Sequence, residues 1–157
     1  MDFAMDSPLV HLVYVSTAAR SFGPEELNNL LNRCRINNQH LGITGVLLYK
    51  GGRFFQELEG PDQAVSSLFQ KISSDPRHTD VTTIICEAIP RRLFSGWSMG
   101  FSDLSLDDLA HILVSNGQDR QSSLANLPDG RTRKLLLAFC NGRWSIDKAL
   151  EMAKSAP

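Results

Sequence analysis

The sequence predicts an α+β fold in which helices cover an antiparallel or mixed sheet. Runs rich in β-branched and aromatic residues alternate with two segments whose apolar residues recur at helical spacing. In chain order these segments are strand, helix, strand, strand, helix, strand and strand. This order is that of the ferredoxin-like plan, which places both helices on one face of the sheet. A length of 157 residues fits one domain with a short extension.

The first strand, residues 9–16, is followed by a helix signal. Pro24 suits the first helical position, where its missing N–H would have no partner in any case. Apolar residues then recur at i, i+3, i+4 and i+7, namely Leu27, Leu30, Leu31 and Cys34. Because Gly42 is typical of the position just beyond a helix end, we expect this helix to run to about Asn38.

A hairpin and a second helix follow the first helix. Residues 43–50 and 53–59 are apolar-rich runs separated by two glycines, which favour a two-residue hairpin turn. A second amphipathic helix opens at Pro61 and ends by Pro76. Residues 81–89 then form a fourth strand, so the chain returns to the sheet.

The C-terminal part completes the sheet and covers it. A short fifth strand is expected near residues 97–101, after a basic loop. Residues 105–157 form a helical extension that can cover the face left bare by the first two helices. Its expected helical segments are 106–114, 131–139 and 145–154. The apolar run within 131–139 is expected to pack on the sheet.

Composition and charge exclude several classes of protein. Lys and Arg total 16 against 17 Asp and Glu, and a net charge of −1 argues against a nucleic-acid binder. No apolar run is long enough to span a bilayer, and acidic residues stand near the N-terminus where a signal peptide needs basic ones. The three cysteines lie in apolar stretches, which indicates reduced, buried thiols in a cytoplasmic protein: Cys34, Cys86 and Cys140.

Catalytic and metal-binding motifs are missing from the sequence. It contains no glycine-rich phosphate loop, no GxSxG and no HExxH. His11, His40 and His111 match no zinc spacing, so no metal site is expected. Hydrolytic chemistry therefore has no visible centre, and we do not expect an enzyme.

The third predicted strand carries a polar residue on an apolar face. Phe54, Gln56 and Leu58 alternate onto the face that the helices are expected to cover. Burying an unpaired amide costs about 1–3 kcal/mol, so Gln56 needs partners. It either bonds to backbone, lies exposed in another register, or contacts a ligand between the sheet and the helices. Rotation of its amide would exchange a donor for an acceptor.

Two further features allow both a structural and a ligand-binding interpretation. Tyr14, on the first strand, is either a core tyrosine or a phenol within reach of a ligand or of Gln56. Asn37 and Asn38 either cap the first helix or pair with a ring edge that presents N–H beside C=O, as a flavin does.

Two pairs of residues lie after the second helix and on the fifth strand. Arg77 and His78 either complement the helix dipole or contact a phosphate or a ring carbonyl. Trp97 and Met99 share a face of the fifth strand, where they either pack in the core or compete for one pocket beside a ligand.

Together these features resemble the BLUF domain, a blue-light sensor that uses FAD. The resemblance covers residues 8–104 and is specific, because many elements stand at matching spacing. These elements are LVYVS at 12–16, NN at 37–38, GITGVLLY at 42–49, FFQELEG at 54–60, DPRH at 75–78 and WSM at 97–99. Residues 105–157 are similar to the helical extension of short BLUF proteins.

The resemblance implies roles for individual residues. Tyr14 matches the photoactive tyrosine, and Gln56 matches the switching glutamine. Asn38, with Asn37 beside it, matches the asparagine that holds the flavin ring. The other implied site residues are Arg77 and His78 at the flavin and its phosphate, Cys34 in the pocket lining, and Trp97 and Met99 in signal relay.

The implied function is that of a photoreceptor. Blue light drives reversible electron and proton transfer from Tyr14 to a noncovalently bound flavin, and Gln56 rearranges its hydrogen bonds. FAD is the expected cofactor, and FMN or riboflavin would meet the same ring contacts. Because no output domain follows residue 104, we expect the fifth strand and the C-terminal helices to signal to a separate partner protein. A cytoplasmic homo-oligomer that binds neither nucleic acid nor membrane is expected.

Two alternatives belong to other classes of protein. One is a light-insensitive interaction module that uses the same fold. The other is an acylphosphatase-like hydrolase, which would need an arginine-centred anion loop after the first strand. Arg20 is the only candidate for that arginine.

Overall fold

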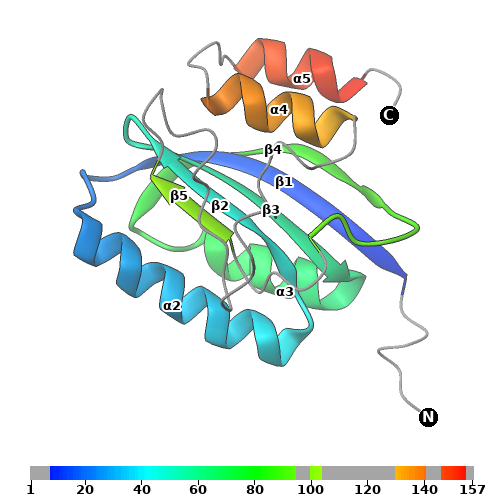
Figure 1. The fold of residues 1–157 in the computed structure, drawn as a ribbon, viewed down its shortest axis with the longest axis horizontal. Coiled ribbons are helices and arrows are strands. Elements are labelled where there is room, and N and C mark those ends of the chain that lie inside the picture. Colours follow the sequence, from blue (N-terminus) through cyan, green and yellow to red (C-terminus); the bar gives the residue numbers. More distant parts are fainter. Residues whose placement is uncertain (1–7, 95–99, 104–129, 141–145, 155–157) are drawn as a thin grey trace.

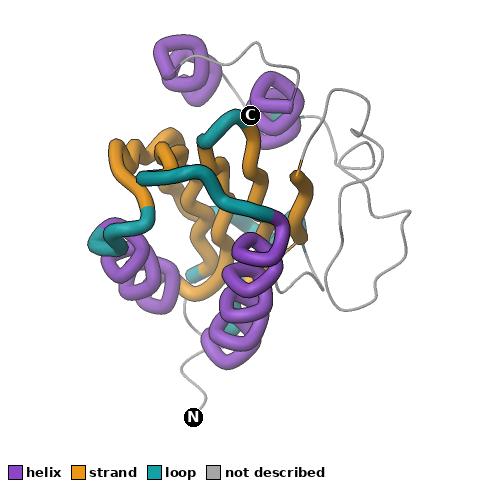
Figure 2. The backbone as a smooth tube through the Cα atoms, turned by 90° about the vertical axis from the view of Figure 1, so that its left-hand side faces the viewer, coloured by secondary structure: helices purple, strands orange, loops and turns teal. Residues whose placement is uncertain are grey.

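The computed structural model describes residues 8–94, 100–103, 130–140 and 146–154. They form three layers, with a sheet between two pairs of helices (Figure 1). A view from the side separates the layers and places the two pairs on opposite faces of the strands (Figure 2).

The sheet has five strands in the order β4-β1-β3-β2-β5. β1 lies antiparallel to both β3 and β4, β2 lies antiparallel to β3, and β5 pairs with β2 in parallel. The α+β, ferredoxin-like prediction with a mixed sheet is therefore confirmed. The strands are β1 (Leu9–Ala18), β2 (Thr44–Lys50), β3 (Arg53–Pro61), β4 (His78–Ala88) and β5 (Gly100–Asp103).

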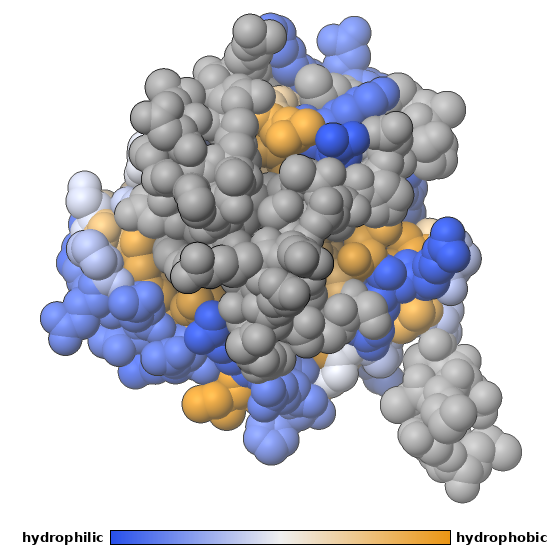
Figure 3. Space-filling view, in the orientation of Figure 1, coloured by the Kyte–Doolittle hydropathy of each residue, from blue (hydrophilic) through white to orange (hydrophobic). Residues whose placement is uncertain are grey.

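Helices α2 (Pro24–Leu41) and α3 (Asp62–Ser73) cover one face of the sheet (Figure 1). α2 is three residues longer than predicted, because Gly42 takes the left-handed conformation at φ 70° and its N–H donates to the carbonyl of Asn38. The interpretation of Asn37 and Asn38 as the cap of this helix is therefore wrong. Figure 3 shows that the outer surface over α2, at the lower left, is largely hydrophilic.

Helices α4 (Arg131–Cys140) and α5 (Ile146–Lys154) cover the opposite face. Leu135, Leu136 and Phe139 are buried there against the sheet, which confirms the predicted packing of this apolar run. The ring of Phe139 lies 5.5 Å from that of Phe55 on β3. The predicted helix at 106–114 lies outside the described residues, as do residues 97–99 of the predicted fifth strand.

Strand alternation divides the buried apolar residues into two clusters. One cluster, with Leu12, Tyr14 and Leu58, lies between the sheet and α2 and α3. The other, with Val13 and Phe55, lies between the sheet and α4 and α5. Consecutive residues of β1 and β3 therefore point to different helix pairs.

The cysteine prediction needs a correction. Cys34 on α2 is half-buried, but Cys86 is exposed because β4 is an edge strand of the sheet. The side chain of Cys140 is outside the described part of the structure. No helix in the described ranges is both long and apolar enough to cross a membrane.

Candidate functional site

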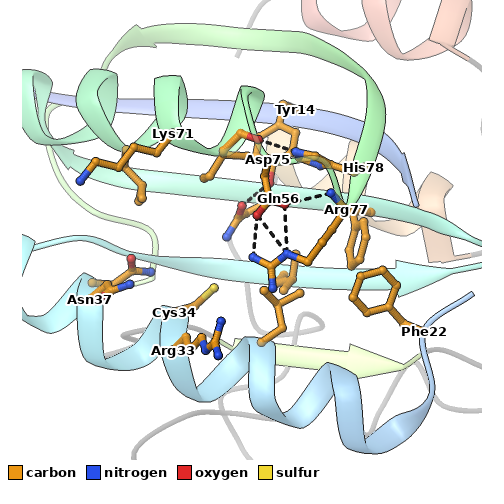
Figure 4. Close-up of a pocket in the computed structure, with 16 residues that line it drawn as sticks. Tyr14, Phe22, Arg33, Cys34, Asn37, Gln56, Lys71, Asp75, Arg77 and His78 are labelled. Atoms are coloured by element: carbon orange, nitrogen blue, oxygen red, sulfur yellow. Dashed lines mark hydrogen bonds and ion pairs between the residues drawn. The ribbon is translucent and has the colours of Figure 1, made fainter. Parts of the chain in front are cut away.

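A cavity of about 300 Å³ lies between the sheet and the α2–α3 pair (Figure 4). This volume is at the lower end of the range for small-molecule sites. Its walls come from β1, β2, β3, α2, α3 and the turn before β4. All seven residues predicted to bind a cofactor line it: Tyr14, Cys34, Asn37, Asn38, Gln56, Arg77 and His78.

Tyr14 and Gln56 form the polar centre of the sheet-side wall. They stand directly opposite each other in the β1–β3 register, and each side chain belongs to a residue that is 3% exposed. The Tyr14 hydroxyl donates a hydrogen bond to Gln56 Oε1. Burial raises the pKa of Tyr14 well above its ordinary value, so the phenol is a neutral donor. Gln56 is thus a buried amide bonded to a side chain, and the exposed-register interpretation is wrong.

The amide of Gln56 can present either of two patterns to Tyr14. With Oε1 toward the phenol, the amide accepts and the phenol donates. After a half-turn of the amide, its NH₂ group would face the phenol, and the phenol oxygen would have to accept. Tyr14 and Gln56 are both buried at the cavity wall. A half-turn of the Gln56 amide would therefore change the hydrogen bonds offered to a molecule in the cavity.

The side chains of α2 line the opposite wall. Leu30, Cys34 and Asn38 follow one another at intervals of four residues, so they share one face of the helix. Burial raises the pKa of the Cys34 thiol to about 11, which keeps it protonated and unreactive. Asn38 is buried at 2% exposure, and Asn37 lies beside it at the cavity wall. These two amides place hydrogen-bond donors and acceptors at this wall.

The turn between α3 and β4 closes one end of the cavity. Arg77 forms a two-pronged ion pair with Asp75, with Nε 3.0 Å from Oδ1 and Nη2 2.6 Å from Oδ2. The hydrogen bond from Arg77 lowers the pKa of Asp75. α3 ends at Ser73, so Arg77 lies four residues beyond it, and a pairing with the dipole of that helix does not explain its position.

His78 is the first residue of β4 and ties three elements together. Its Nε2 lies 2.5 Å from the carbonyl oxygen of Ile72, so this nitrogen carries the proton and donates. Its Nδ1 lies 2.9 Å from the hydroxyl of Ser16 on β1. The ring also stands edge-on to Tyr14, with centroids 6.3 Å apart. His78 therefore fixes the cavity end next to the phenol.

Two cations at the cavity were not predicted. Arg33 on α2 and Lys71 on α3 line it from two sides, whereas the charge of Arg77 is balanced by Asp75 (Figure 4). Helical spacing from Asn37 could have identified Arg33, which lies one turn earlier on the same face. Cations with apolar walls between them fit a ligand that combines a flat ring with phosphate. The apolar wall residues are Phe22, Leu30, Leu47, Phe54, Leu68 and Ile72.

The hydrolase alternative finds no support at Arg20. Its guanidinium is occupied by Glu26, with Nη2 2.6 Å from Oε2 and Nη1 3.2 Å from Oε1. Arg20 is not among the residues that line the cavity. The loop after β1 therefore does not aim its arginine at this site.

The segment that leads toward Trp97 and Met99 is anchored to β3. The carboxylate of Glu59 accepts hydrogen bonds from the backbone N–H of Leu93 at 2.9 Å and of Phe94 at 2.6 Å. Trp97 and Met99 themselves lie outside the described residues, so their predicted relay role stays a prediction.

A protein-family model matches residues 9–100 of the chain. The family is BLUF, described as sensors of blue light using FAD. The chain is 41% identical over 95 residues to the photoactivated adenylate cyclase subunit beta of Euglena longa. This match covers 60% of this chain and 11% of that protein. It thus spans about a tenth of the length of the Euglena beta-subunit relatives.

Solved structures with a similar fold include BlrB and BlrP1. The dark-state structure of the BLUF protein BlrB is 38% identical with a TM-score of 0.62, and the match covers 66% of this chain and 80% of that one. BlrP1 of Klebsiella pneumoniae, in a manganese/cy-diGMP complex, is 36% identical with a TM-score of 0.69. That match covers 84% of this chain and 32% of BlrP1.

Proposed function

The chain belongs to the BLUF family of blue-light sensors that use FAD, and from this premise we propose a light-driven switch centred on Tyr14 and Gln56. The observation that carries the proposal is the buried hydrogen bond from Tyr14 to Gln56 at the wall of a cavity large enough for a ring. No other described pair at that wall joins an electron-rich phenol to an amide with two orientations.

A bound flavin supplies absorption of blue light and a transient acceptor for one electron. Tyr14 gives up an electron and its hydroxyl proton and then takes both back, so no covalent change remains. The lasting change is in Gln56, whose amide exchanges its hydrogen bonds with Tyr14 and the ring.

The remaining cavity residues hold and orient the cofactor. The amides of Asn37 and Asn38 pair with the polar edge of the ring, because an amide offers a donor and an acceptor side by side. Arg33 and Lys71 neutralise the phosphate of FAD or FMN, and Arg77, held by Asp75, contacts the cofactor at the cavity end. His78 orients the cavity end beside Tyr14 through its bonds to Ser16 and Ile72.

The output is proposed to be a contact with a separate protein. Residues 8–104 act as the sensor, and residues 105–157 act as a helical cap and partner surface. Trp97 and Met99 relay the change at Gln56 through β5 to the cap, which a partner reads as a shift between two states. We assign the chain no catalytic activity of its own and place it as a homo-oligomer in the cytoplasm.

Absorption spectroscopy of the purified, flavin-loaded protein tests the switch. The dark spectrum should shift slightly to the red after blue light and return in the dark. The Gln56→Leu variant should keep flavin bound and lose the shift. Gln70→Leu, at an exposed position of α3, is the matched control and should behave as the wild type. A full shift in Gln56→Leu would contradict the assigned role, and bleaching of the wild type would indicate net reduction instead.

A further inference from the structure

A second buried polar cluster lies on the side of the sheet away from the cavity. It joins one side chain from each of β3, β1, β4 and α4, namely Glu57, His11, Glu87 and Arg131. Because successive residues of a strand point to opposite faces, Glu57 faces α4 and α5 while its neighbour Gln56 faces the cavity. We call these four residues the far-face network.

The contacts form a line from the centre of the sheet to both C-terminal helices. His11 Nδ1 lies 3.0 Å from Glu57 Oε1, and His11 Nε2 lies 3.0 Å from Glu87 Oε1. Arg131 donates to the same oxygen of Glu87, and its Nη1 donates over 2.7 Å to the carbonyl of Ala153 on α5. The network therefore connects three strands to α4 and α5.

The geometry around His11 requires an additional proton. Each of its ring nitrogens faces a carboxylate oxygen, whereas a neutral imidazole has one donor nitrogen and one acceptor nitrogen. Either the ring is protonated on both nitrogens, or one of the facing carboxyl groups is protonated. The network thus holds one proton more than a neutral histidine between two ionised carboxylates.

That proton balances the buried charge. With it, two carboxylates, one imidazolium and one guanidinium sum to zero. Without it, a net negative charge remains where Glu57 is 0% and His11 is 4% exposed. Within the described ranges, Glu57 Oε2 has no hydrogen-bond partner that could compensate. Because an uncompensated buried charge is costly, loss of the proton opposes this packing.

The charged neighbours do not replace the missing proton. Glu59, two residues along β3, has the guanidinium of Arg92 beside it and is already bonded to Thr44 and to two backbone N–H groups. Arg133 on α4 is half-buried and already takes part in an interaction. The other described charged residues of α4 and α5 are exposed: Lys134, Asp147, Lys148, Glu151 and Lys154.

The pKa directions agree with this placement of the proton. Burial raises the pKa of Glu57 to about 7, although its bond to His11 acts to lower it. Burial acts to lower the pKa of His11, but its bonds to Glu57 and Glu87 outweigh this and the net change is upward. The pKa of Glu87 is lowered, because its bonds to His11 and Arg131 outweigh burial. The proton therefore belongs to the Glu57–His11 pair.

We propose that the far-face network is a proton-dependent latch that holds the α4–α5 pair against the sheet. When the pair leaves, water reaches the network and its groups return to their ordinary pKa values. The docked state thus binds the proton more tightly. Docking is at full strength just below the ordinary imidazole pKa of 6.5 and weakens as the pH rises through the pKa of the docked pair.

Amide hydrogen exchange of the full, flavin-loaded chain in the dark, measured from pH 6 to pH 9, tests the latch. Rates are corrected for the intrinsic effect of pH, and the amides of α2 serve as an internal reference. The opening equilibrium of α4 and α5 should rise by up to about tenfold per pH unit above pH 6.5, since one proton is released on opening. An α4–α5 response that only parallels that of α2 would overturn the proposal.

Two variants separate the latch from general destabilisation. Glu57→Gln keeps the shape of the side chain but cannot leave a negative charge, so the pH dependence of α4–α5 opening should flatten. Glu87→Gln alters a half-buried position, folds more readily, and should flatten it as well. Glu151→Gln, at an exposed position of α5, should keep the wild-type slope. A wild-type slope in both network variants would overturn the latch even if docking were weaker.

Discussion

The two faces of the sheet use their buried polar groups in opposite ways. Toward α2 and α3, the buried polar side chains are neutral and border a cavity, as with Tyr14, Asn38 and Gln56. Toward α4 and α5, the space is filled by apolar side chains, and the polar groups are charged and bonded to one another, as with Glu57 and His11. Neutral groups beside a cavity can exchange partners with a ligand, whereas charged groups without space hold elements together.

The largest expected effect tests the cavity face at a single oxygen atom. Tyr14→Phe removes the buried hydroxyl and should abolish the normal light-induced spectral shift while flavin stays bound, because the donor to Gln56 is lost. The measurement is the light-minus-dark absorption difference. Tyr49→Phe is the matched control, since Tyr49 is also buried but does not line the cavity, and its hydroxyl accepts from the backbone N–H of Phe22. Equal losses in both variants would contradict a specific role for Tyr14.

The next prediction compares how tightly the two faces of the sheet are packed, by removing a leucine side chain from each. Leu135→Ala on the filled face should lower the free energy of unfolding by about 3 kcal/mol, because Leu135 is 0% exposed and its loss leaves a void. Leu68→Ala at the cavity wall should cost about 1 kcal/mol, since that side chain is only half-buried and already borders open space. Urea unfolding of both variants measures the difference. Equal costs would show that the cavity face is packed as tightly as the other.

A smaller effect concerns the cations at the cavity. Arg33→Met should weaken binding of FAD and FMN by up to about fivefold and leave riboflavin almost unchanged, because an exposed charge pair contributes less than about 1 kcal/mol. Titration of the apoprotein with the three flavins measures the ratio. Arg53→Met, at an exposed position of β3 outside the cavity lining, is the control. Equal weakening for riboflavin would contradict a phosphate contact.

Local patterns in the sequence account for much of this arrangement. Alternation along β3 correctly placed Gln56 on the helix-covered face, and helical spacing correctly placed Leu30 and Cys34 on one side of α2. The end of α2 was misplaced because it depends on the backbone conformation of Gly42, which residue type favours but does not fix.

The far-face network could not be predicted from local patterns. His11 meets Glu87 only through the pairing of β1 with β4, which is irregular between Val13 and Tyr14. Its link to Arg131 further depends on how α4 packs on the sheet. His11 and Glu87 are 76 positions apart in the sequence. Such a contact follows from tertiary packing and leaves no periodic signal in the sequence.

The smallest expected effect tests whether the two faces are coupled through β3. Gln56 and Glu57 are adjacent, so a change in the hydrogen bonds of Gln56 that displaces the strand also displaces the carboxylate that holds His11. Under blue light, the exchange protection of α4 and α5 should change by a few-fold, since a switch of this kind shifts a population by only the difference in interaction between two states. Hydrogen exchange in light and darkness at pH 6.5 measures this change.

Glu57→Gln shows where that coupling runs. If the strand transmits the change through the far-face network, this variant should keep the flavin red shift and lose most of the light-induced change at α4 and α5. Glu151→Gln should keep both responses. An undiminished response in Glu57→Gln would mean that light reaches the C-terminal helices by a path that bypasses the latch, such as the segment anchored by Glu59. The two faces would then share a strand but operate independently.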